Sequence, residues 1–533
     1  MVDKQNTFVV REALLEELFA FYTFGYSPDE EGFSQFRQDF DKYITCRFGS
    51  IFADAKYVVI EQSYVETEWK DMISLHYINT TYAAKLLPRT IRIHFFTAPK
   101  LADDECLGFI TLRPIEEIQI ALSYIFVNLD MLKKTFEADE GEHIKCKFVG
   151  YAKRIHCLGG ELSIKTYPLL TQDTIVTCCA DVNIVTLSRF LAHKLGGKKL
   201  EIRDICKDDY NVVFPRQITA DRFIKLCSKM HIPFKTRHIY ANALDNTIAE
   251  SDKVDHSSTS PFRSQKEITR YIDTYLDSDL PVVIFVRGHV IQIIGYKCVN
   301  GSKEYLVLDD SGFMDPESKN RFCYFSDIKT ALSPIPSYTN ADIPCMTTSG
   351  GEGLDEDIKL MFRFHHFLQN SVITIGIPQS DRVYIDYYYY EILLENMIRY
   401  QWSTGSEPFN LFLDEERNFL PGVEIRSQLV ECTYFMQYLL ENIRIAEAHA
   451  DLVGIDRVIA NLEGAVSTLQ SLPLPHYLWY TELTNDCGVC VGLCADPTRF
   501  YKDTTHLHKV FYNSLFDDDK RGIAVVKSMW DFD

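Results

Sequence analysis

The 533-residue sequence contains no stretch of about 18 consecutive apolar residues, so no transmembrane helix is expected. Its first residues lack a basic flank followed by an unbroken apolar run, so we expect no secretory signal peptide. An excess of positive charge is also missing, because 55 Lys and Arg stand against 75 Asp and Glu, a net charge of −20. This charge repels phosphate backbones and anionic lipid surfaces, so neither nucleic-acid nor membrane partners are expected.

The 15 cysteines are odd in number and scattered, which does not resemble a disulfide framework. They fit a reducing compartment, and we therefore predict a cytoplasmic protein in which most cysteines are small core residues. With 46% apolar and 13% aromatic residues the chain can bury several cores. Its length suggests about three domains.

Changes in sequence texture predict three regions. Residues 1–150 would form an N-terminal region that is helical over 8–45 and then mixed α/β from Tyr57 onwards. Residues 151–345 alternate helix and strand patterns and carry the richest chemistry. A Gly-rich linker at 347–357 precedes a C-terminal α/β region over 356–533.

A cysteine pair marks the start of one predicted helix. Cys178 and Cys179 stand directly before an amphipathic pattern that ends near Gly196. A thiol at a helix N-terminus lies at the positive end of the macrodipole, which lowers the thiol pKa and favours the nucleophilic thiolate. Gln172 comes shortly before the pair.

A histidine and an aspartate lie further along, in a pattern of helix, strand, strand, hairpin and strand. His289 opens the second strand, VNGS supplies the hairpin turn, and Asp309 ends the third strand. The carboxylate can then hold the imidazole tautomer. Asp310 is the alternative, but Asp309 directly ends the alternating strand. In this order the cysteine attacks a carbonyl, the histidine is base and then acid, and Gln172 with a backbone N–H stabilises the oxyanion.

These segments resemble the active-site blocks of papain-like cysteine peptidases, especially the bacteriocin-processing, C39-like branch. The matching pieces are Gln172 followed by Cys-Cys-Ala, the stretch LPVVIFVRGHVIQIIGY, and YLVLDD. RIHFF at 92–96 and LGFITLRP at 107–114 also resemble a companion region of uncharacterised bacterial proteins of this kind. The resemblance implies a Cys-His-Asp triad in a C39-like unit over 151–345, acting without a cofactor.

Two arguments disagree about the nucleophile. Cys178 follows Gln172 with the spacing that resembles papain. Helix phase favours Cys179, because a helix starting there places Val182 inward, whereas a start at Cys178 puts Asp181 where such enzymes bury an apolar side chain. We favour Cys179, since loop spacing changes more easily than helix phase, and keep Cys178 as the alternative.

The sequence thus predicts an α+β protein whose papain-like central unit has a helix-start cysteine and an antiparallel sheet carrying the histidine and aspartate. The expected function is thiol-dependent hydrolysis of a peptide or isopeptide bond in a polypeptide substrate. Acyl transfer or deamidation by the same triad, and an inactive peptide-binding module, remain alternatives. The oligomeric state is left open.

A C-terminal cluster consists of residue types that bind zinc. Its members are Cys487, Cys490, Cys494, His506 and His508. Alternating apolar residues between the cysteines are typical of a strand, whereas structural zinc sites usually take their ligands from turns. We therefore expect core cysteines here and no metal.

Overall fold

The structure is a computed structural model. It describes residues 9–10, 52, 54–75, 90–115, 118–140, 144–171, 179–196, 198–207, 220–240, 265–286, 289–309, 323–327, 372–380, 382–383, 385–403, 412–414, 416, 418–449, 452, 454–471, 476–485, 490–498, 507–512, 514–516, 522–524 and 529. None of the helices in these ranges is both long and apolar enough to cross a membrane.

The described chain is mixed α and β with antiparallel sheets, as the sequence predicted for its class. It divides into two compact units. Unit 1 comprises Met1–Gln265 and Pro281–Pro378, and unit 2 comprises Lys266–Leu280 and Gln379–Asp533. These units do not follow the three predicted regions, because strands from 1–150 and from 372–378 share a sheet with the predicted central unit.

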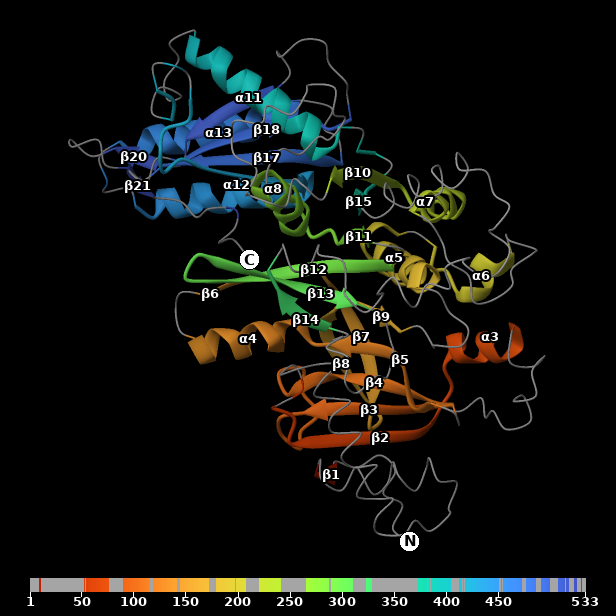
Figure 1. Ribbon diagram of the computed structural model, residues 1–533. Coiled ribbons are helices and arrows are strands. Elements are labelled where there is room, and N and C mark those ends of the chain that lie inside the picture. The colour runs from red at the N-terminus through yellow and green to blue at the C-terminus, as the bar shows by residue number, and fades with distance from the viewer. Residues whose placement is uncertain are drawn as a thin grey trace, which may run out of the picture. The chain divides into compact units, whose positions relative to one another are not determined.

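The first sheet of unit 1 is built from the N-terminal region (Figure 1). Its antiparallel order is β1 (Val9–Val10), β2 (Tyr57–Tyr64), β3 (Thr90–Phe96), β4 (Cys106–Ile115), β5 (Ile118–Val127) and β9 (Leu169–Leu170). One face buries Ile91, Ile93 and Phe95 in its core. The other contacts a hairpin of β7 (Tyr151–Cys157) and β8 (Gly160–Thr166), where Arg92 Nη2 donates to the His156 carbonyl at 2.8 Å.

The second sheet of unit 1 carries the predicted histidine and aspartate. Its order is β10 (Phe234–Tyr240), β15 (Val372–Pro378), β11 (Val282–Val286), β12 (His289–Val299), β13 (Ser302–Asp309) and β14 (Cys323–Ser326), and β6 (Ile144–Phe148) pairs with the later half of β12. The helices of unit 1 are α3 (Thr67–Leu75), α4 (Leu129–Glu140), α5 (Cys179–Leu195), α6 (Ile202–Lys207) and α7 (Ala220–Lys229).

The predicted hairpin between the second and third strands is confirmed. β12 and β13 are joined by Asn300 and Gly301, whose φ angles are 50° and 80°. A two-residue loop with both φ angles positive has the backbone twist that suits two antiparallel strands, and the Asn-Gly pair tolerates it best. This turn, together with a β-bulge between Ile293 and Tyr296 that shifts the register by one residue, pairs Asp309 with Ile291 near the beginning of β12.

Unit 2 has an antiparallel sheet with helices on both faces. The sheet order is β16 (Glu424–Glu431), β17 (Tyr477–Thr484), β18 (Cys490–Ala495) and β19 (Leu507–Tyr512), and β20 (Ser514–Phe516) pairs with β21 (Gly522–Ala524). Its helices are α8 (Gln265–Asp277), α11 (Tyr387–Ser403), α12 (Cys432–Glu447) and α13 (Ile455–Ser471).

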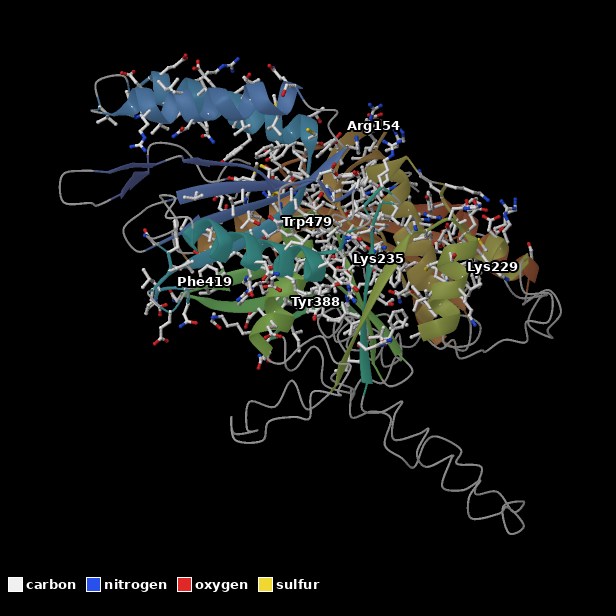
Figure 2. All side chains as sticks on the ribbon, turned by 90° about the horizontal axis from the view of Figure 1, so that it is seen from above. Arg154, Lys229, Lys235, Tyr388, Phe419 and Trp479 are labelled. Atoms are coloured by element: carbon white, nitrogen blue, oxygen red, sulfur yellow. The ribbon has the colours of Figure 1, made fainter. Side chains whose placement is uncertain are left out.

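Alternation along β17 explains this layering. Leu478 and Tyr480 join the core that contains α12 and α13. Trp479, labelled in Figure 2, faces the other way and stacks on Tyr390 of α11 at 5.3 Å, while Tyr275 of α8 meets it edge-on at 6.0 Å. Each side of the sheet therefore buries large apolar area under a different helix pair.

Three sequence-based expectations are corrected here. Val9–Val10 pair with β2, although a helix was expected over 8–45; the rest of that stretch lies outside the described residues, as does the linker at 347–357. The apolar pattern over 423–448 predicts a long helix, but Glu424–Glu431 form a strand, because the segment pairs along its length with β17. Val372–Pro378 belong to unit 1, because their strand, with Ile375 and Ile377 fully buried, fits between β10 and β11.

Candidate active site

The predicted nucleophile stands at the first described residue of α5, since that helix begins at Cys179. Val182 is buried, as the helix phase that begins at Cys179 predicts, and so are Ile184 and Val185. Asp181 is buried as well, at 1% exposure, so the first turns of α5 are enclosed on all sides. Burial therefore does not distinguish the two phases, and the choice of Cys179 over Cys178 stays a prediction.

The predicted base and its orienting acid stand on neighbouring strands. His289 is the first residue of β12, and Asp309 is the last residue of β13. Asp309 pairs with Ile291, two residues after His289, and its side chain is 2% exposed. Residues two apart on a strand share one face, so His289 and Asp309 occupy diagonal positions on the same face of the sheet.

Three buried side chains join α5 to β12 and to the segment before β9. The Tyr167 hydroxyl donates to Gln292 Oε1 at 2.6 Å. Gln292 Nε2 donates to Asn183 Oδ1, and Asn183 Nδ2 donates to the Val290 carbonyl at 3.5 Å. We call Tyr167, Gln292 and Asn183 the polar clamp. It brings the first turns of α5 against the first residues of β12.

The polar clamp also defines where the predicted pair can meet. Asn183 lies one helical turn after Cys179, and Val290 directly follows His289. Alternation puts Gln292 on the face of β12 that contacts α5 and positions 289 and 291 on the opposite face. A pair formed by Cys179 and His289 must therefore form at the end of the strand, where α5 begins, and not across the middle of the sheet.

Several predicted residues lie outside the described part. Gln172, Cys178 and Asp310 are among them, as are the side chains of Cys179 and His289. The structure thus places His289 and Asp309 on paired strands and the helix that begins at Cys179 against β12, while the contacts within the predicted triad stay a prediction.

The buried cysteines of unit 1 have a different environment from that of a helix N-terminus. Cys106 on β4 and Cys157 on β7 are buried, and loss of hydration raises the pKa of each thiol to about 12. Burial also raises the pKa of Cys227 on α7. These thiols stay protonated at neutral pH and are poor nucleophiles.

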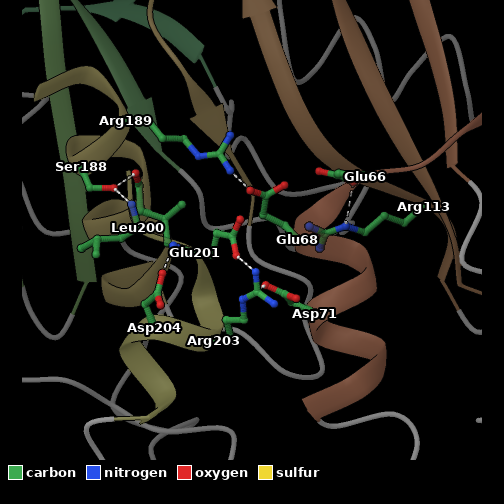
Figure 3. A network of polar contacts seen from close by, with 11 residues as sticks. Glu66, Glu68, Asp71, Arg113, Ser188, Arg189, Leu200, Glu201, Arg203 and Asp204 are labelled. Carbon is green, nitrogen blue, oxygen red and sulfur yellow. Dashed lines mark hydrogen bonds and ion pairs between the residues drawn. The ribbon is translucent and has the colours of Figure 1, made fainter. Parts of the chain in front are cut away.

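A network of charges links α5 and α6 to the N-terminal region (Figure 3). Arg189, ten residues after Cys179 on α5, pairs with Glu68 of α3. Two further pairs are Arg113 with Glu66 at 3.8 Å and Arg203 with Asp71 at 3.6 Å. Arg113, Glu66 and Glu68 are almost wholly buried. The helix that carries Cys179 is thus anchored on residues 66–113.

The C-terminal cysteines occupy strand positions. Cys490 begins β18, Cys494 lies in its interior at 4% exposure, and Cys494 pairs with His508 of β19. Four strand residues span about 13 Å, so Cys490 and Cys494 cannot ligate one zinc ion. Cys487 and His506 lie outside the described residues. Within the described part, no three His, Cys, Asp or Glu side chains are grouped to hold a metal ion.

Sequence reasoning missed the polar clamp. The sequence does contain a signal for these residues, because Gln292 interrupts the apolar run VIQIIGY and Asn183 stands between Val182 and Ile184. A polar residue in an otherwise buried pattern needs a hydrogen-bonding partner. The sequence could show that partners were required, but not that these residues are partners of one another.

No family model matches the chain, and no curated protein and no solved structure matches it either. Function is therefore inferred from the site and from the motif resemblance of the sequence.

Proposed function

We propose that unit 1 is a thiol-dependent hydrolase with a papain-like arrangement, which cleaves a peptide or isopeptide bond. The observation that carries this proposal is the contact between two elements: α5, which begins at Cys179, packs its first turns on β12, which begins at His289. Asp309 ends the adjacent strand, diagonal to His289.

These positions suit nucleophilic catalysis. A seventeen-residue helix presents its positive end at Cys179 and favours the thiolate. The thiol proton passes to His289, and the sulfur attacks the carbonyl carbon. His289 then returns the proton to the leaving amine, which departs and leaves a thioester. Water, deprotonated by His289, cleaves the thioester, while Asp309 orients the imidazole. Gln172, whose role is inferred from the sequence resemblance, would stabilise the oxyanion.

A covalent thiol probe tests this proposal. Iodoacetamide at neutral pH, followed by peptide mapping, should modify Cys179 fastest, and labelling there should be lost in Cys179→Ala and strongly slowed in His289→Ala. Cys298→Ser, which removes a half-buried cysteine at the far end of β12, is the matched control and should label Cys179 like the original protein. Enhanced labelling at neither Cys178 nor Cys179 would reject the proposal, and labelling at Cys178 alone would move the nucleophile.

A further inference from the structure

The polar clamp joins three of the four segments that bear the predicted catalytic groups. Tyr167 stands five residues before Gln172, Asn183 lies on the helix that begins at Cys179, and Gln292 lies on the strand that begins at His289. All three side chains are at most 4% exposed. We propose that the polar clamp is a positioning device that sets the distance between the start of α5 and the start of β12. This inference rests on the proposed thiol chemistry.

Hydrogen bonding gives the polar clamp a single geometry. The donors run in one direction, from the Tyr167 hydroxyl through Gln292 and Asn183 to the Val290 carbonyl. Apolar side chains would also fill this space, but they would allow α5 to slide along β12 without losing a specific contact. Separating a buried polar group from its hydrogen-bonding partner costs free energy, so the polar clamp resists such sliding.

The polar clamp acts close to the reacting groups. Asn183 is four residues from Cys179, a rise of about 6 Å along the helix. Val290, the acceptor at the end of the polar clamp, is next to His289. A displacement of α5 is therefore passed on to the separation between thiol and imidazole. A misplacement of about 1 Å can lower a rate by about 100-fold.

Packing holds the Tyr167 side chain in the position from which it donates to Gln292. Its ring packs on Phe190 of α5 at 5.2 Å between ring centres. Burial raises the pKa of Tyr167 well above its ordinary value, so the hydroxyl keeps its proton and donates throughout the neutral range. Removing only this hydroxyl leaves Gln292 Oε1 without its donor and keeps the ring in the core.

The test measures the rate of iodoacetamide reaction at Cys179 against pH in the full chain. Gln292→Leu and Tyr167→Phe break the polar clamp at different bonds. The exchange Asn183→Gln with Gln292→Asn keeps the summed length of the two side chains. Ser188→Ala is the matched control, because the buried Ser188 hydroxyl lies on the same helix, about two and a half turns from Cys179, and accepts from the Leu200 N–H at 3.0 Å.

We expect Cys179 in the Gln292→Leu and Tyr167→Phe variants to react about 10-fold more slowly at pH 7. The pKa of its thiol should shift upward, because a more distant imidazolium stabilises the thiolate less. The exchanged pair should recover most of the rate, and Ser188→Ala should keep the original pH profile. Folded variants that retain the original rate and profile would overturn the positioning role alone. If the original protein shows enhanced reaction at neither Cys178 nor Cys179, the proposed function itself fails, and the positioning role falls with it.

Discussion

The charge network predicts that the N-terminal region and α5 unfold together. The perturbation is Glu68→Gln, which removes the negative partner of Arg189 and keeps the side-chain shape. Breaking a buried pair from one side costs about 3–5 kcal/mol, whereas an exposed pair contributes about 0–1 kcal/mol. Glu68 is 3% exposed but Arg189 is 20% exposed, so water compensates in part. We expect a loss of about 2–3 kcal/mol in the free energy of unfolding.

The assay is urea unfolding followed by the fluorescence of Trp69, a fully buried residue of α3 whose ring lies 5.6 Å from the Arg113 guanidinium. Replacing Trp402, Trp479 and Trp530 by Phe in the background removes the three other indoles of the chain, all in unit 2, from the signal. Glu441→Gln is the control, because its partner Arg444 is 76% exposed and the change should cost less than about 0.5 kcal/mol.

A double-mutant cycle with Arg189→Met completes the test. The double variant should lose less stability than the two single changes added together, because the charge left unpaired in each single variant is gone. Additive losses, or a Glu68→Gln midpoint equal to that of the control, would refute the coupling of α3 to α5.

Two further predictions concern unit 1. First, stability should fall as pH decreases below about 6.5, because burial lowers the pKa of His94 from 6.5 and the unfolded chain then takes up a proton that the folded chain does not. A second loss should follow between pH 4.5 and 2, because hydrogen bonds from His94 and Arg92 outweigh burial and lower the pKa of Glu61 from 4.5 to about 2. Urea midpoints against pH check both steps. Burial also lowers the pKa of His193, so the comparison is made in a His193→Gln background, where an upper step that persists in His94→Gln contradicts its assignment. Second, Gly295→Ala should lower the free energy of unfolding by about 1–3 kcal/mol, because the added carbon overlaps the Lys147 carbonyl of β6. Gly464→Ala, with open space around it on α13, should not be destabilising, and equal losses in both would show that the close approach of β6 is not the cause.

Local structure was largely predictable from the sequence. The strands around Val58, Ile93 and Phe109 follow from short β-branched and aromatic runs, and the turn at Asn300 and Gly301 follows from residues that tolerate positive φ. These features depend on neighbours in the chain. The same holds for the start of α5, where an apolar pattern of helical period begins.

Assignment of segments to units was not predictable. β15 and β11 pair although 86 residues separate Val286 from Val372, and α8 belongs to unit 2 although its sequence runs straight into β11. Both segments have enough apolar residues to be buried in either unit. Only contacts with residues distant in the sequence decide which unit each segment joins. The polar clamp was unpredictable for a similar reason, since Tyr167 and Gln292 lie 125 residues apart.

The central claim is that the start of α5 and the start of β12 hold a thiolate beside an imidazolium. Its most direct test is the pH dependence of iodoacetamide reaction at Cys179, resolved by peptide mapping, in the original protein and in His289→Ala. The account predicts a thiol pKa well below about 8.5 that rises towards that value when the imidazole is removed. An ordinary thiol pKa that is the same in both proteins would contradict it.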